Sequence, residues 1–250
     1  MVFSQKTCYI ISMDNTKKIT LLLVIFLALT TYSFGEAFYG MAGGFYRTFE
    51  RFPKENYGRD LDAGNFIIML NYYPETLPVG WFVRTSFGGI VGGFEWQENK
   101  MNTLNIASAS DIQISAGPSY KFMLGSMIHI PVSFGLSYTN YREENEGLRE
   151  WFNYRYSVVD SFYRAFKFGL LGDAAIMVNP VSWLTITALG VNISCDFLHW
   201  ERGYMEGKFR SISNGQFQFA NASAFKLGFY FGVGLRFDSN NRAKDNEEEQ

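Results

Sequence analysis

The segment 224–237 constrains the fold of this chain more than any other, because two kinds of side chain alternate along its whole length. Its odd-numbered positions are large and apolar, whereas its even-numbered positions are small, or polar with a long side chain. Alternation with a period of two predicts a β-strand whose two faces meet different surroundings. The large set comprises Phe225, Leu227, Phe229, Phe231, Val233, Leu235 and Phe237, and the other set Ala224, Lys226, Gly228, Tyr230, Gly232, Gly234 and Arg236.

The size of the apolar side chains decides which face of this strand points into the barrel and which points out. An eight-stranded barrel has an interior just wide enough for side chains to fill it, or for one small ligand. A face as bulky as this one, repeated on every strand, would overfill that interior, so we expect it to lie outside. Such an exterior requires lipid around it, and the alternation therefore predicts a transmembrane β-barrel.

The chain contains eight runs of this kind, which predict an all-β, eight-stranded antiparallel transmembrane barrel over residues 38–237. Aromatic residues make up 18% of the chain, as expected where aromatic girdles mark the two membrane interfaces. Tight turns alternate with long charged connections, which is typical of outer-membrane barrels with short periplasmic turns and long extracellular loops. We expect strands at 38–49, 65–73, 81–94, 111–120, 127–138, 163–178, 183–197 and 224–237, tight turns at 74–78, 122–126 and 179–182, and long loops at 50–64, 95–110, 140–162 and 198–223.

The two ends of the chain are expected to lie outside the barrel. Residues 1–37 read as a cleaved signal peptide, because two lysines precede an apolar run at 19–29 that is too short to span a membrane comfortably. Met13 offers an alternative start, and an uncleaved anchor helix is the other reading of this segment. Residues 238–250 form a polar, acidic tail that we expect to be disordered.

The parity of the strands places several ionisable side chains inside the barrel. Across the last short turn, the expected register sets Lys167 opposite Ser194, which makes Asp196 a diagonal neighbour of the lysine. Lys226 approaches the same carboxylate from the other side, and a buried charge must be paired. We therefore expect a network centred on Asp196 that helps to close the barrel to ions; separate solvated side chains at the rim are the alternative. The predicted lumen residues are Lys167, Asp196, Lys226, Arg84, His129 and Arg236.

The sequence offers little that points to catalysis, a metal or a cofactor, and we expect none of the three. His129, set opposite Ser119 by the expected register, suits a hydrogen-bonding role inside the barrel. His199 lies near Asp196 and Glu201 without a matching Ser, so an esterase or acyltransferase site there is the weaker reading. No cluster shows metal-ligand spacing, and a net charge of −2 gives no electrostatic case for nucleic-acid binding.

The longest charged stretch, at 141–156, also carries several aromatic residues. Trp, Tyr and Arg are the residues enriched in binding hot spots. This loop is therefore the best candidate for contact with an extracellular partner, and a solvated loop without a partner is the alternative. The candidate contact residues are Arg142, Arg149, Trp151, Phe152, Tyr154, Arg155 and Tyr156.

From Phe38 to Phe237 the chain resembles the small eight-stranded outer-membrane proteins of the OmpA, OmpX and OmpW type. The most specific match ends the last run, where Tyr230, Gly232, Leu235 and Phe237 resemble the C-terminal signal that the barrel-assembly machinery recognises. In those proteins the last aromatic residue usually ends the chain, whereas here the acidic tail follows it.

The resemblance implies a protein exported to the bacterial outer membrane, with outer-membrane lipid and the barrel-assembly machinery as partners. It implies a narrow conduit for small hydrophobic solutes, or a surface-exposed structural protein. An adhesin or other partner-binding surface protein, acting through its long loops on an extracellular ligand, is the alternative, and a lipid-modifying barrel enzyme is a weaker one.

Overall fold

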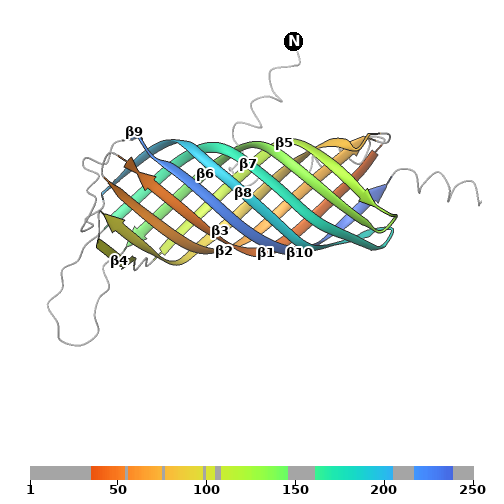
Figure 1. Ribbon diagram of the computed structural model, residues 1–250, viewed down its shortest axis with the longest axis horizontal. Helices are drawn as coiled ribbons and strands as arrows, with labels where there is room; N and C mark the ends of the chain where they lie inside the picture. The colour runs from red at the N-terminus through yellow and green to blue at the C-terminus, as the bar shows by residue number, and fades with distance from the viewer. Residues whose placement is uncertain are drawn as a thin grey trace, which may run out of the picture.

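One antiparallel sheet closes on itself to form a barrel (Figure 1). The computed structural model describes residues 35–53, 56–74, 77–97, 100–104, 108–145, 161–204 and 217–238. The wall is made of the long strands β1 (Gly35–Phe52), β2 (Tyr57–Pro74), β3 (Val79–Gln97), β5 (Ser108–Leu124), β6 (Ile128–Asn145), β7 (Ser161–Val181), β8 (Leu184–Tyr204) and β10 (Ser223–Asp238). Two short strands, β4 (Lys100–Leu104) and β9 (Gln218–Ala220), pair with β3 and β8. The predicted eight-stranded antiparallel barrel is confirmed.

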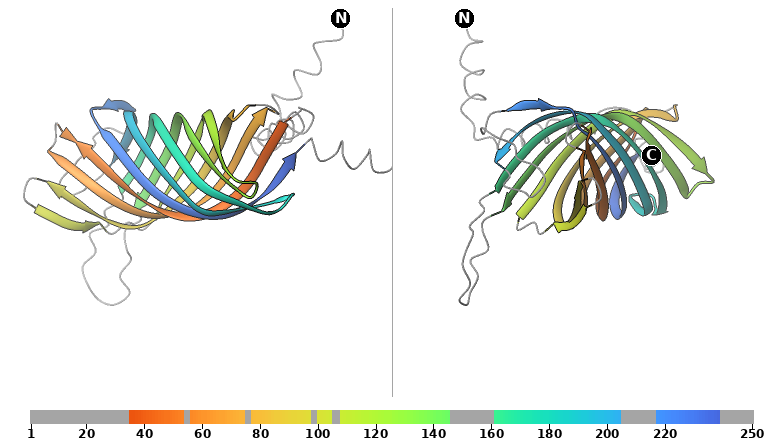
Figure 2. Two further views of the ribbon diagram at one scale, coloured as in Figure 1. Left: turned by 45° about the vertical axis from the view of Figure 1, so that its right-hand side comes forward. Right: turned by 60° about the vertical axis from the view of Figure 1, so that its left-hand side comes forward.

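The barrel closes through the pairing of its first and last strands. β1 pairs with β10 from Glu36↔Asp238 to Arg51↔Ser223, and β10 pairs in turn with β8. Each long strand therefore has a neighbour on both sides, and the wall runs continuously around the lumen (Figure 2). Among the residues described, no helix is long and apolar enough to cross a membrane.

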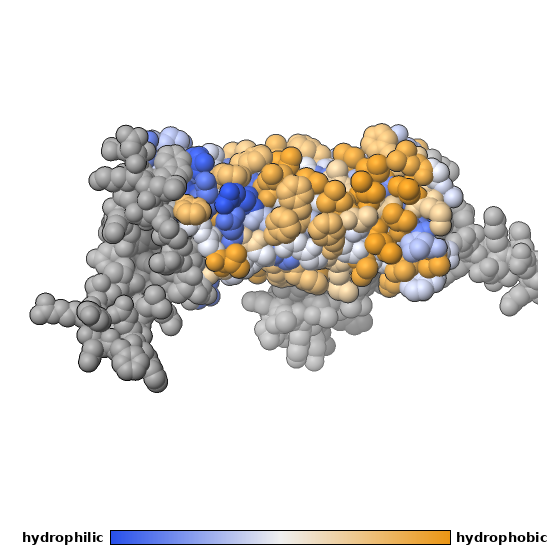
Figure 3. Space-filling model, turned by 60° about the horizontal axis from the view of Figure 1, so that its bottom comes forward, coloured by the Kyte–Doolittle hydropathy of each residue, from blue (hydrophilic) through white to orange (hydrophobic). Residues whose placement is uncertain are grey.

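The large apolar side chains lie on the outside of the barrel. On β10, Phe231 is 53% exposed whereas the neighbouring Tyr230 is 1% exposed; on β6, Leu136 is 71% exposed whereas Ser137 is buried. Apolar residues cover much of the face drawn in Figure 3, and hydrophilic residues gather towards its left-hand end. The predicted arrangement, with bulky residues facing lipid and small or polar residues facing the lumen, is confirmed.

The strands run further than the sequence pattern predicted. β1 and β2 continue through most of the segment 50–64, β8 continues to Tyr204, and β4 pairs with β3 within the segment 95–110. The expected loop boundaries were wrong because charge was taken as a sign of a solvated loop. Glu50 and Arg59 are charged, yet they alternate into the lumen and pair with each other there.

The register of the β5–β6 hairpin also differs from the prediction. His129 lies opposite Met123 and not Ser119, which instead lies opposite Ser133. The turn is tighter than expected and contains Gly125 at a φ of 74°, in the left-handed region that glycine adopts readily. The pairing is shifted by four positions, an even number, so every side chain stays on its predicted face.

The register of β7 against β8 also differs from the prediction, but for another reason. Lys167 lies opposite His199 and not Ser194. A bulge places an extra residue in one strand and shifts the pairing beyond it. Alternation alone does not count these extra residues, so the predicted register was wrong. The shifts occur between Phe168/Gly169, Ile176/Met177 and Val178/Val181.

Candidate functional site

The lumen holds ionic and polar side chains that meet from strands on different sides of the barrel. They form four clusters, which we name in order from the end with long connections to the end with short turns. The outer cluster is Glu50, Arg59, Tyr141, Glu143 and Lys167; the middle cluster is Tyr46, Asp111 and Lys226; the inner cluster is Arg84, Asp173 and Tyr230; and the rim cluster is Glu36, Lys121 and Arg236.

Arg59, on β2, connects the two carboxylates of the outer cluster. Its Nη1 donates to Glu143 Oε2 at 2.8 Å, and its Nε donates to Glu50 on β1. The other carboxylate oxygen of Glu50 accepts a hydrogen bond from Lys167 Nζ, and the Tyr141 hydroxyl donates to Glu143 at 2.8 Å. Arg59 is 1% exposed, so protein carboxylates take the place of water in stabilising its charge.

Two tyrosine rings pack against Arg59 at this end of the lumen. The guanidinium carbon of Arg59 lies 4.8 Å from the centroid of the Tyr163 ring and 5.3 Å from that of Tyr141, within the range of a cation–π contact. The Tyr163 hydroxyl donates to Glu201 at 2.8 Å. The guanidinium is thus enclosed by carboxylates and rings together.

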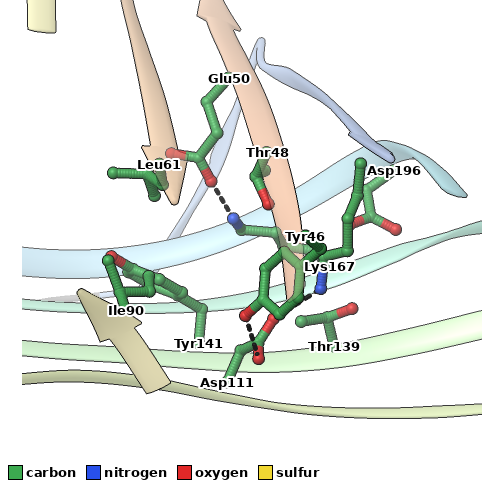
Figure 4. Close-up of a pocket in the computed structure, with 11 residues that line it drawn as sticks. Tyr46, Thr48, Glu50, Leu61, Ile90, Asp111, Thr139, Tyr141, Lys167 and Asp196 are labelled. Carbon is green, nitrogen blue, oxygen red and sulfur yellow. Dashed lines mark hydrogen bonds and ion pairs between the residues drawn. The ribbon is translucent and has the colours of Figure 1, made fainter. Parts of the chain in front are cut away.

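The middle cluster joins β1, β5 and β10. Lys226 Nζ donates to Asp111 Oδ2 at 2.6 Å, and the Tyr46 hydroxyl donates to the other carboxylate oxygen, also at 2.6 Å. Lys226 Nζ lies 4.2 Å from the centroid of the Tyr46 ring. Figure 4 shows the Tyr46–Asp111 contact close to the pair that Lys167 makes with Glu50.

A small cavity lies between the outer and middle clusters (Figure 4). The volume open to the centre of a water molecule is about 10 Å³, which is room for about one water. Asp196 lines this cavity, and its Oδ1 accepts a hydrogen bond from Ser137 Oγ at 3.4 Å. Polar and apolar side chains line the cavity together, and it is far too small for a solute.

The inner cluster crosses the lumen from β3 to β7 and β10. Arg84 donates to Asp173 Oδ2, and the Tyr230 hydroxyl donates to Asp173 Oδ1 at 2.8 Å. The guanidinium carbon of Arg84 lies 4.8 Å from the centroid of the Tyr230 ring. Tyr230 also packs into a buried apolar layer, so ionic and apolar groups fill this level together. The other members of that layer are Ala42, Ile67, Met69, Ala175 and Met177.

The rim cluster closes the end with short turns. Arg236 Nε donates to Glu36 Oε1 at 2.5 Å, and Lys121 Nζ donates to the other oxygen of the same carboxylate. Next to it, the ring of His129 lies 4.6 Å from that of Phe38, centroid to centroid. Glu36 and Arg236 come from the first and last strands, so this pair links the two strands that close the barrel.

The predicted network centred on Asp196 is wrong in its pairing. Lys167 pairs with Glu50, and Lys226 pairs with Asp111. Asp196 is buried and lines the cavity beside both lysines, but neither lysine forms its ion pair with it. The sequence argument considered only adjacent strands, whereas the carboxylates that hold these lysines reach them from across the lumen.

Of the other predicted lumen residues, Arg84 belongs to the inner cluster, Arg236 belongs to the rim cluster, and His129 lies beside Phe38 and Asn179. Arg84 and His129 are buried, and Arg236 is partly exposed at the end of the barrel. Sequence reasoning missed Arg59 and Glu36 because the expected strands excluded them, and it assigned no role to Asp173 although that residue lies within the expected strand 163–178. Continuing the parity of 38–49 by one residue would have placed Glu50 inward.

Both histidines lie inside the barrel. His129 Nδ1 is 3.3 Å from Asn179 Nδ2. His199 is fully buried opposite Lys167, so the residue considered for an esterase site lies within the ionic filling of the lumen. Within the described part of the chain, no group of three His, Cys, Asp or Glu side chains is arranged to hold a metal ion.

The candidate partner loop is described only at its start. Arg142 lies on β6 and points outward, exposed. The proposed assembly signal lies on β10, where Tyr230 faces the lumen and Leu235 and Phe237 face outward; its recognition remains a prediction. The remaining candidate contact residues lie outside the described residues: Arg149, Trp151, Phe152, Tyr154, Arg155 and Tyr156.

A closed antiparallel barrel with lipid-compatible side chains outside and ion pairs inside is the architecture of the outer-membrane β-barrel proteins. The chain has the fold of the small, eight-stranded members of that class.

Solved structures of this class resemble the chain. The outer membrane protein OprG from Pseudomonas aeruginosa matches with a TM-score of 0.53 at 9% identity, over 83% of this chain and 98% of that one. A major outer membrane protein from Thermus thermophilus matches with a TM-score of 0.48 at 13% identity, over 81% and 99%. Ail, the attachment invasion locus protein of Yersinia pestis, matches with a TM-score of 0.40 at 10% identity, over 82% and 99%.

These similarities concern the fold and do not extend to function, because the sequence identities are low. No known family model and no curated protein sequence matches the chain.

Proposed function

We propose that the protein is a closed, non-conducting barrel of the bacterial outer membrane that serves as a surface-exposed structural protein. The observation that carries this proposal is the filling of the lumen by four ionic clusters, one after another along the barrel. A buried ion pair that loses one partner leaves an uncompensated charge, which costs about 3–5 kcal/mol. Opening a path past all four clusters would incur such a cost repeatedly.

The alternative, a narrow conduit for small hydrophobic solutes, has less support from the lumen. The cavity between the outer and middle clusters has room for about one water, and polar or charged groups such as Thr48, Thr139 and Asp196 line it. A hydrophobic solute passing through would have to displace the ion pairs and also the apolar side chains that already fill the lumen, such as Ile67 and Met69. A conduit would therefore need a large rearrangement of the barrel interior.

Export through a cleaved signal peptide, with the short turns left in the periplasm, is part of the proposal. The tight β5–β6 and β7–β8 connections lie at one end, and the longer connections that follow β6 and β8 lie at the other. In bacterial outer-membrane barrels these ends face the periplasm and the exterior, respectively. No catalytic role is included.

Planar-bilayer recording of the purified full chain tests the closed lumen. We expect the wild type to show no steady porin-like conductance. Arg59→Ala should remain closed as well, because it removes only the outer cluster and leaves the inner and rim clusters in place. Large, steady conductance from the wild type would contradict the proposal, and steady conductance from Arg59→Ala alone would show that the outer cluster is the single seal.

A further inference from the structure

The first strand, β1, has a defined start at the short-turn end of the barrel. Within the described chain, Glu36 is the first residue paired with both neighbouring strands, because it lies opposite Asp238 on β10 and Tyr73 on β2. Gly35 lies opposite Pro74 of β2, a residue that has no backbone N–H to donate. The segment before Gly35 lies outside the described residues. The closed wall therefore begins at Glu36.

The side chain of Glu36 connects this start to two other strands. Its Oε1 accepts a hydrogen bond from Arg236 Nε on β10, and its Oε2 accepts one from Lys121 Nζ on β5. The three side chains are at most 18% exposed, so their charges are largely shielded from water and need compensation within the protein. A mature chain that lacked Glu36 would lose the carboxylate that both cations contact.

Two bonds that suit a signal peptidase flank Glu36 in the sequence. Such an enzyme cleaves where small residues stand one and three positions before the bond. Ser33 and Gly35 satisfy this pattern for cleavage before Glu36, and Gly35 and Ala37 satisfy it for cleavage before Phe38. The pattern of small residues does not choose between the two bonds. They differ in whether Glu36 stays with the barrel.

Cleavage before Phe38 would disrupt the short-turn end of the barrel. It removes the Glu36 carboxylate together with the β1 positions that lie opposite Asp238 and Phe237. It also places the new α-ammonium group on Phe38, which is 3% exposed and whose ring centroid lies 5.8 Å from Lys121 Nζ. An α-ammonium group is largely charged at neutral pH, and burying it costs free energy unless a counter-charge compensates it. The rim cluster would thus gain a cation and lose its carboxylate.

Cleavage before Glu36 preserves the rim cluster. Glu36 keeps its pairing with β2 and β10 and its contacts with Lys121 and Arg236. The new α-ammonium group then belongs to a residue that is partly exposed, whereas Phe38 is buried. The charge created by cleavage can therefore be hydrated at the end of the strand, which avoids the cost of burying it.

We propose that a signal peptidase cleaves the Gly35–Glu36 bond and that Glu36 is the first residue of the mature barrel. Hydrolysis of this bond consumes one water molecule: Gly35 leaves with a new carboxylate, and Glu36 keeps a free α-amino group. The signal peptide then ends at residue 35 and not at the expected residue 37. The site rests on the proposed export through a cleaved signal peptide, and it does not depend on whether the lumen conducts.

Intact-mass measurement and N-terminal sequencing of the protein test the site. The full chain, without an added tag at its N-terminus, is expressed in a bacterium that has an outer membrane and is purified from the membrane fraction. We expect the first residue to be Glu36. A chain that begins at Phe38, or at any other internal residue, would overturn the site and leave cleaved export standing. An unprocessed chain would overturn cleaved export in the proposed function, and the site with it.

A matched pair of variants places the same large side chain before each of the two bonds. Gly35→Gln should abolish cleavage before Glu36, because the position directly before the bond must be small. Ala37→Gln should be cleaved before Glu36 as completely as the wild type. Loss of processing in Ala37→Gln together with normal processing of Gly35→Gln would overturn the proposal, and so would normal processing of both variants.

Processing is read independently of folding. Cells are pulse-labelled, and the masses of the precursor and the processed chain are compared after denaturation, so a variant that fails to form a barrel still reports its cleavage.

Discussion

At the scale of single residues, the structure assigns opposite environments to neighbours in the chain. Phe231 points into the surroundings of the barrel, whereas Gly232 faces inward and lies against β1. A Cβ atom at position 232 would lie 2.7 Å from the Cβ of Ala42, closer than real Cβ atoms approach. Substitutions at these two adjacent positions therefore act through different surroundings, one through lipid and the other through the wall.

We expect Phe231→Arg to lower the free energy of unfolding in bilayers by about 2–4 kcal/mol, the cost of a cation near the midplane. Phe231→Leu, which stays apolar, should cost much less. Urea-induced unfolding of the protein in lipid vesicles measures both. A Phe231→Arg variant that unfolds at the same urea concentration as wild type would contradict the assignment of this face to lipid.

Glu50 forms ion pairs with two cations inside the lumen, so we expect its substitution to destabilise the barrel. We expect Glu50→Gln to lower the free energy of unfolding by about 3–5 kcal/mol, because Arg59 and Lys167 lose a shared counter-ion in a buried setting. Asp62→Asn, in the exposed pair with Arg47, should cost about 0–1 kcal/mol. The same vesicle measurement compares the two, and similar costs for both would show that water reaches the outer cluster.

At the scale of strands, the sequence predicted the faces well and the lengths poorly. The alternation of large and small residues on 224–237 and 127–138 identified which side chains meet lipid, because bulk and polarity change together there. It did not identify where strands end, because the outer ends of β1 and β2 carry charged residues on both faces. Nor did it identify partners across the lumen: Glu50 and Lys167 are 117 residues apart, and no local pattern relates them.

The orientation of the strands can be tested on intact cells. We expect added protease to cut within 146–160, between β6 and β7, because the proposed orientation places this connection outside the cell. The turn between β7 and β8 should be cut only after the outer membrane is permeabilised. Cleavage at that turn in intact cells would reverse the orientation of the whole barrel.

At the scale of the whole molecule, charged residues are arranged differently in the lumen and on the outer surface. The lumen is filled by ion pairs, some between adjacent strands, such as Glu50–Arg59, and some across the barrel, such as Arg84–Asp173. On the outer surface, Arg47 and Arg51 on β1 form ion pairs with Asp62 and Asp60 on β2.

The distances along the chain between the paired lumen residues bear on the order in which the barrel is made. Arg84 and Asp173 are 89 residues apart, Asp111 and Lys226 are 115 apart, and Glu36 and Arg236 are 200 apart. While the sheet is still open, each of these charges faces its surroundings without the strand that carries its partner. We therefore expect these three pairs to form only as β1 joins β10, whereas Glu50 and Arg59 lie opposite each other on β1 and β2 and can pair earlier. Until closure, the unpaired charges of a partly closed sheet need water against them.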